Sequence, residues 1–99
     1  MNYKGEGITR NLAKAVEWFG KAADAGHPTA QLNFGTMYSK GDGVPKDLVQ
    51  AYKWANLAAS AKEAGAADFR ASLAAMMTPD QIARAEKLSR EWKPRLSLR

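Results

Sequence analysis

The chain has 99 residues with a formal net charge of +5, and 25% of its residues are charged. This length suits one small domain, and abundant Ala with few β-branched residues favours helices over strands. The lack of Cys excludes disulfide bonds and thiolate metal sites, and no apolar run approaches the roughly 20 residues that a membrane-spanning helix needs.

The first predicted helix begins after Asn11 and ends at Gly26. Asn is a favoured N-cap residue, and Gly readily adopts the left-handed conformation that ends a helix. Apolar and small residues recur between them with helical spacing: Ala15, Trp18, Phe19, Ala22 and Ala23. Trp18 is expected to be a packing residue of the core.

A second helix is predicted over residues 28–40, because Pro28 suits the first turn and Gly41 follows as a terminator. Gly35 would let a neighbouring backbone approach closely. The core face is expected to hold Ala30, Phe34, Met37 and Tyr38. A different side, at i, i+4, i+7 and i+11 spacing, carries Thr29, Asn33, Thr36 and Lys40. These four residues are the predicted partner-binding surface; the alternative is that they are simply solvated.

A third helix follows a Gly-rich turn, Gly41–Lys46, in which Pro45 keeps the preceding residue from helical conformation. Asp47 is its predicted N-cap. Its helical face carries Leu48, Ala51, Tyr52, Trp54, Ala55, Ala58 and Ala59. The alanines would let a neighbouring helix approach, and Trp54 would fill the larger gap.

Two further helices are predicted after a turn near Gly65. The first has an apolar face of Ala66, Phe69, Leu73 and Met76. The segment Thr78-Pro79-Asp80-Gln81 is a strong start signal for the second, with an N-cap, a Pro at N1 and a Gln at N3. The buried side of this last helix is expected to carry Ile82, Ala85, Leu88 and Trp92. Its polar opposite side suits the terminal cap of a solenoid.

The chain contains an internal repeat whose counterparts differ by 36 in number, as Trp18 and Trp54 do. Laying residues 1–27 on residues 37–63 gives ten identities, against roughly two or three expected by chance for this composition. The identities include both glycines of Gly5-Glu6-Gly7 and Gly41-Asp42-Gly43. A period of this size indicates stacked units of two helices each.

These residues resemble a known family. The segment from Ala30 to Tyr38, the turn Gly41-Asp42-Gly43-Val44 and the helix with Asp47, Ala51, Trp54, Ala58 and Ala59 look like the Sel-one-like repeat (SLR), a relative of the tetratricopeptide repeat. The segment from Ala75 to Trp92 is similar to the closing helix of bacterial members. The resemblance implies a short right-handed α/α superhelix, an all-α solenoid with a C-terminal capping helix. It also implies a scaffold that binds proteins without catalysis.

The expected organisation is one SLR domain over residues 1–92, followed by a basic tail, 93–99. The domain would comprise a half repeat (1–27), a full repeat (28–64) and capping helices (65–92). The half repeat lacks the family's first helix, so the chain is expected to be a piece of a longer protein or to self-associate through its exposed face. The compartment stays open, cytoplasmic or, with an export signal upstream, periplasmic or secreted.

No catalytic, metal-binding or cofactor-binding residues are predicted. His27 is the only His and lies in a Gly-His-Pro turn without ligand or dyad partners. The Gly-x-Gly turns lack the strand, third Gly and Lys of a phosphate loop, and Asp42 with Asp47 supplies too few oxygen ligands for calcium. We therefore expect a non-enzymatic protein with no cofactor and no small-molecule substrate.

Two functions remain. The first is a scaffold or adaptor that binds a protein or peptide in the groove of the stacked helices. The alternative is a binder of nucleic acid or acidic lipid, for which the sequence offers six C-terminal basic residues: Arg84, Lys87, Arg90, Lys93, Arg95 and Arg99. Nucleic acid is the less favoured partner, because a nucleic-acid-binding protein usually carries a stripe of basic residues interleaved with aromatic residues.

Overall fold

The computed structural model describes the backbone of residues 6–93 and the side chains of residues 12–93. Within this range the chain forms helices and no strand. The helices are α1 (Glu6–Asp24), α2 (Pro28–Lys40), α3 (Leu48–Ser60), α4 (Ala66–Ala74) and α5 (Pro79–Glu91). The all-α fold expected from composition and spacing is therefore confirmed.

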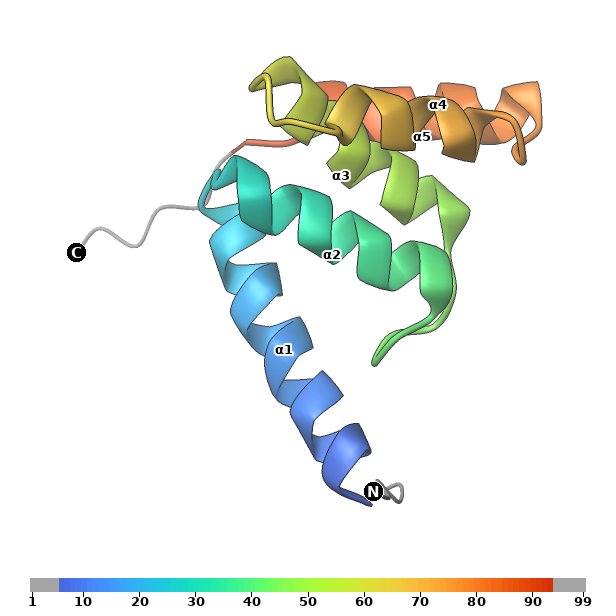
Figure 1. Ribbon diagram of the computed structural model, residues 1–99. Coiled ribbons are helices and arrows are strands. Elements are labelled where there is room, and N and C mark those ends of the chain that lie inside the picture. Colours follow the sequence, from blue (N-terminus) through green and yellow to red (C-terminus); the bar gives the residue numbers. More distant parts are fainter. Residues whose placement is uncertain (1–5, 94–99) are drawn as a thin grey trace.

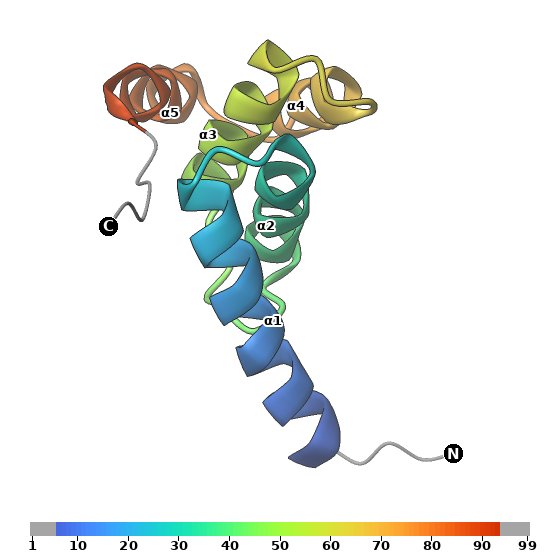
Figure 2. The ribbon, with the colours of Figure 1, turned by 90° about the vertical axis from the view of Figure 1, so that its left-hand side faces the viewer.

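The helix α3 lies at the centre of the molecule. It packs against α2, α4 and α5, and α1 packs against α2. Figure 2 shows α4 and α5 on opposite sides of α3, while α1 projects away from the other helices toward the N-terminal end, as Figure 1 also shows. One long face of α1 thus stands at the edge of the stack.

The start of α1 differs from the prediction, because the helix begins at Glu6 and Asn11 lies inside it. The counterpart segment before α3 is a turn in which Gly41 and Gly43 have positive φ angles. Pro45 accounts for the difference, since it disfavours helix at the preceding residue. Thr9 occupies the same place in the first unit, and it has a backbone N–H and no such restriction.

The other helix starts follow the local signals. The Asp47 side chain accepts a hydrogen bond from the Gln50 backbone N–H at 3.1 Å. At α5, Thr78 and Gln81 form a reciprocal capping box: the Gln81 N–H donates to Thr78 Oγ1 at 3.1 Å, and the Thr78 N–H donates to Gln81 Oε1 at 2.9 Å. These caps satisfy backbone donors that the first turn of a helix leaves unpaired.

The core consists of two clusters that meet at α3. One joins α1, α2 and α3 through Ala23, Phe34, Met37 and Trp54. The other joins α3 to α4 and α5 through Ala51, Tyr52, Ala55, Leu73, Met77 and Ala85. The prediction that Met76 belongs to the buried face of α4 is wrong, because Met76 is 60% exposed and Met77 is buried in its place. The helix ends at Ala74, so the helical spacing that led to Met76 no longer applies there.

The end of α5 returns to the first helical pair. Trp92 follows α5 as its C-cap and packs edge-on against Trp54, with ring centroids 6.0 Å apart. Its indole N–H donates to Asp24 Oδ1 at 3.4 Å, and Ser89 is buried with its hydroxyl 3.3 Å from the Lys53 carbonyl oxygen. The last helix is therefore attached to both α3 and the end of α1.

Candidate interaction surface

The two repeat-related tryptophans have opposite environments. Trp54 on α3 is 3% exposed, whereas Trp18 on α1 is 74% exposed. The prediction that Trp18 belongs to the core is therefore wrong. The helix α2 covers the indole of Trp54, with Phe34 at 5.5 Å between ring centroids. Among the described helices, α2 alone packs extensively against α1.

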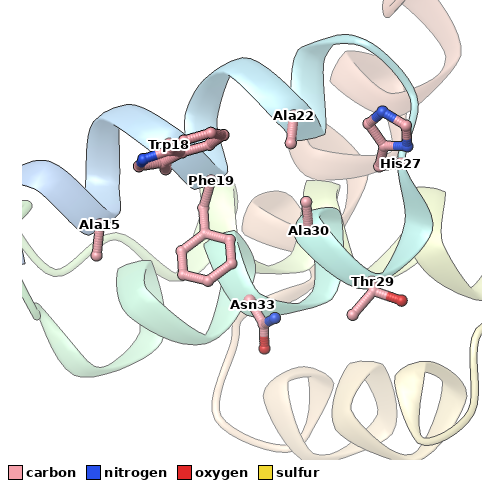
Figure 3. Close-up of a pocket in the computed structure, with 8 residues that line it drawn as sticks. All are labelled: Ala15, Trp18, Phe19, Ala22, His27, Thr29, Ala30 and Asn33. Carbon is pink, nitrogen blue, oxygen red and sulfur yellow. The ribbon is translucent and has the colours of Figure 1, made fainter.

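Beside Trp18 lies an apolar hollow of about 460 Å³ between α1 and α2. We call it the α1–α2 hollow. Its lining residues are Ala15, Trp18, Phe19, Ala22, His27, Thr29, Ala30 and Asn33. Figure 3 shows the α1 residues on one side and the α2 residues on the other, with Ala22 facing Ala30 and Phe19 facing Asn33. An exposed apolar concavity of this kind is typical of a binding surface.

The sequence positions this surface by dividing α1 into two faces. Ala23 is fully buried against the core, and a Cβ built on Gly20 would lie 3.3 Å from Phe34 Cζ, so this side of α1 packs closely on α2. Trp18 and Ala22, at i and i+4, follow each other on a neighbouring side of the helix. Trp18 remains exposed because α2 packs on the side of α1 that carries Gly20 and Ala23.

Two of the four sequence-predicted binding residues line the α1–α2 hollow. Thr29 and Asn33 line the hollow, and both are exposed. The Thr29 hydroxyl donates to Glu63 Oε2 at 3.0 Å, so it is already tied to the α3–α4 connection. Thr36 is partly buried and its hydroxyl donates to the Leu32 carbonyl oxygen at 2.9 Å. Thr36 and Lys40 lie outside the lining of the hollow.

The principal residues that the sequence reasoning missed are those of α1. The sequence placed Ala15, Trp18, Phe19 and Ala22 on one apolar helical face and assigned Trp18 to the core, without identifying the face as a binding surface. Periodicity identifies an apolar face and leaves open what covers it. The departure of the first unit from the repeat pattern led only to the expectation of self-association through an exposed face.

Charged groups gather at a second place, where α1, α3 and the end of α5 meet. The Lys53 ammonium lies 4.2 Å from the centroid of the Trp54 ring. Burial lowers the pKa of Lys53, and the nearby carboxylate of Asp24 opposes this shift. The same Asp24 carboxylate accepts the hydrogen bond from the Trp92 indole N–H, which ties the end of α5 to this place.

The basic residues of the alternative function are exposed where they are described. Arg84, Lys87, Arg90 and Lys93 are all exposed on or just after α5, whereas Arg95 and Arg99 lie outside the described residues. They are interspersed with Glu86 and Glu91. Within residues 12–93, no group of three or more His or acidic side chains could hold a metal ion. None of the described helices combines the length and apolar character needed to span a bilayer.

Comparisons with known proteins give the family. The family model of the Sel1 repeat, the Sel-one-like repeat, matches residues 1–27 and 28–62. The chain belongs to the Sel1 repeat family. No curated protein matches. Among solved structures, the chain is similar to a protective antigen present in uropathogenic Escherichia coli strains, which displays an SLR fold. The two share 32% sequence identity and a TM-score of 0.78 over 82% of this chain.

This Sel1 repeat chain spans only 18% of the length of the antigen chain that it matches. The match therefore shows the repeat fold, and it does not carry over the role of the antigen. Sel1 repeats generally mediate protein–protein interactions and typically form non-enzymatic scaffolds. For this Sel1 repeat chain, a protein partner is accordingly the expected kind of ligand.

Proposed function

We propose that this chain is a non-catalytic scaffold module that binds a partner protein at the α1–α2 hollow. The observation that carries the proposal is the contrast between Trp54, which is 3% exposed, and Trp18, which is 74% exposed at the same position of the repeat. A large exposed indole beside an apolar concavity is uncommon on a monomer surface and typical of protein-binding sites.

The composition of the hollow favours a protein ligand. Ala15, Ala22 and Ala30 give a smooth apolar floor, and the aromatic rings of Trp18 and Phe19 supply contact area. Asn33 and His27 lie at its rim and can form hydrogen bonds that fix orientation. Because Trp is enriched among residues that dominate binding energy, Trp18 is the residue we expect to matter most.

Site-specific photo-cross-linking tests the proposal. A photoreactive amino acid at Ala22 would lie in the hollow, and the same residue at Ser72, which is exposed on α4, serves as the matched control. We expect adducts with a defined protein from Ala22 only, and their loss when Trp18→Ala is added. Equal adducts from both positions, or adducts that persist without the indole, would contradict the assignment of this surface.

The alternative, binding to an anionic surface through the basic C-terminal end, differs in its salt dependence. Binding to phosphate groups falls steeply with ionic strength. Binding in the α1–α2 hollow is dominated by apolar contact and should change little between low and physiological salt. A steep salt dependence together with full binding by Trp18→Ala would move the site to α5.

A further inference from the structure

We infer that a pocket at the C-terminal end of α3 binds an arginine side chain of a partner protein. This pocket, which we call the α3-end pocket, has a volume of about 320 Å³. Its lining comes from the α1–α2 turn, the first turn of α2, the end of α3 and the end of α5: Gly26, Gln31, Leu57, Ser60, Ala61 and Trp92. It shares no lining residue with the α1–α2 hollow. The inference therefore goes beyond the proposed function and does not depend on it.

A buried glutamine supplies the polar atom that faces the α3-end pocket. Gln31 is 3% exposed, and its Nε2 donates to the Ala23 carbonyl oxygen at 3.2 Å. A carbonyl oxygen can only accept, so the amide has to keep its nitrogen on that side and its oxygen on the other. Among the described residues no donor bonds to Gln31 Oε1. This oxygen is not fully enclosed, so it opens into the pocket that Gln31 lines.

The backbone of the lining has used its donors and kept acceptors. The N–H groups of Gly26 and Ala61 donate to carbonyl groups of the preceding helical turns, and the Trp92 indole N–H donates to Asp24 at 3.4 Å. The carbonyl groups of Ser60 and Ala61 accept no N–H from the part of the backbone that the structure describes. Apart from one hydroxyl and one amide N–H, the pocket therefore asks its ligand for hydrogen-bond donors.

Helix ends give the α3-end pocket a preference for positive charge. Both α1 and α3 end at its lining, and the C-terminal end of a helix carries a partial negative charge. The opposite, N-terminal end of α2 contributes Thr29 and Ala30 to the α1–α2 hollow instead. The carboxylate of Asp24 and the ammonium of Lys53 attract each other beside the Trp54–Trp92 pair, so these two charges largely offset each other.

The apolar walls select an arginine among cations. Leu57 and Trp92 are both partly buried, and an indole ring is the best aromatic partner for a cation. A guanidinium group is planar, stacks on aromatic rings, loses water more readily than an ammonium and carries five N–H donors. Its aliphatic stem can lie on Leu57 while its donors reach Gln31 Oε1 and the end of α3. A metal ion fits less well, because none of the six lining residues has a carboxylate.

The test uses the full chain labelled with ¹⁵N and the probe N-acetyl-L-arginine N-methylamide, whose blocked ends imitate an arginine within a protein. We expect a saturable shift of the Trp92 indole N–H signal in NMR spectra, assigned with Trp92→Phe, and no shift of the exposed Trp18 indole. The citrulline analogue has nearly the same shape without the charge. It should bind at least about tenfold more weakly, because hydrogen bonds from charged donors are stronger.

Two matched substitutions place the probe. Ala61 and Ala64 are both exposed on the α3–α4 connection, and of the two Ala61 alone lines the pocket. Ala61→Leu should fill the pocket and weaken binding of the arginine probe at least about tenfold, whereas Ala64→Leu should bind as the original chain does. Gln31→Met, which removes the acceptor at similar size, should weaken binding as Ala61→Leu does.

Several results would overturn the inference. Equal binding of the arginine and citrulline probes would show that charge is not recognised, and equal loss with Ala61→Leu and Ala64→Leu would place the probe elsewhere. Free L-arginine that binds more than about tenfold tighter than the blocked probe would indicate a small-molecule site. Binding seen in Arg95→Gln alone would show that the chain's own arginine is the occupant. Since no arm needs Trp18 or a captured partner, failure of the proposed function would leave these results unchanged.

Discussion

Replacing each repeat tryptophan by alanine in turn tests the central contrast of the structure. Trp18→Ala and Trp54→Ala make the same chemical change at the same position of two repeat units. Trp54 packs against Phe34 and Trp92, with ring centroids at 5.5 Å and 6.0 Å. Trp18 has most of its surface in solvent. Trp54→Ala should therefore lose mainly stability, whereas Trp18→Ala should lose mainly partner binding.

The expected losses in the free energy of unfolding follow from the exposed fractions of the two side chains, 3% for Trp54 and 74% for Trp18. Burying a Trp side chain removes roughly 200 Å² from water, which is worth about 5 kcal/mol at about 25 cal/mol per Å². Trp54→Ala should therefore lower the free energy of unfolding by about 4–5 kcal/mol, within the usual range for deleting a large buried aromatic residue. Because much less of the Trp18 side chain is buried, Trp18→Ala should lower the free energy of unfolding by only about 1 kcal/mol.

Urea denaturation followed by circular dichroism at the helical band measures both effects. Folded domains have a free energy of unfolding of about 5–15 kcal/mol, so Trp54→Ala should lose most of its stability or fail to fold. Trp18→Ala should keep the same slope with a slightly lower midpoint, and its melting temperature should fall by about 4–8 °C. Binding of the cross-linked partner should be lost in this stable variant.

Two results would refute the reasoning. If Trp18→Ala destabilised the chain as much as Trp54→Ala, the indole of Trp18 would be buried in solution. If Trp18→Ala kept both full stability and full partner binding, the α1–α2 hollow would not be the site. Trp18→Phe provides a milder comparison, because it keeps an aromatic ring at the surface and should keep part of the affinity.

Four other outcomes are expected. Light scattering should show self-association that grows with protein concentration and weakens with Trp18→Ala, as an exposed apolar face predicts; a monomer at every concentration would contradict this. Gly35→Ala should lower the urea midpoint, because contact with the Ala51 carbonyl oxygen at 3.0 Å costs about 1–3 kcal/mol and outweighs the gain in helix propensity of about 1 kcal/mol. Thr78→Ala should cost about 1 kcal/mol through loss of the α5 cap, and an unchanged midpoint would argue against that capping box. Arg90→Glu with Lys93→Glu should leave stability within about 0.5 kcal/mol and partner binding unchanged; loss of binding would favour the anionic-surface alternative.

The elements that the sequence predicted correctly depend on interactions between near neighbours. The caps at Asp47 and Thr78 each bond to a backbone N–H three residues away, so the signal and its partner lie in one short segment. The termination of α2 at Gly41, with a φ of 75°, is equally local. The 36-residue repeat and the buried face of α2 were also readable, since both are periodic patterns along the chain.

The tertiary structure decided what covers each apolar face. Trp18 and Trp54 have the same place in the same pattern, but Phe34 of α2 and Trp92 at the end of α5 pack on Trp54 and make it a core residue. Thr36 is partly buried, and its hydroxyl donates to the Leu32 carbonyl oxygen of its own helix. Burial depends on which other segments lie within contact distance, and a residue's own helical spacing carries no information about those segments.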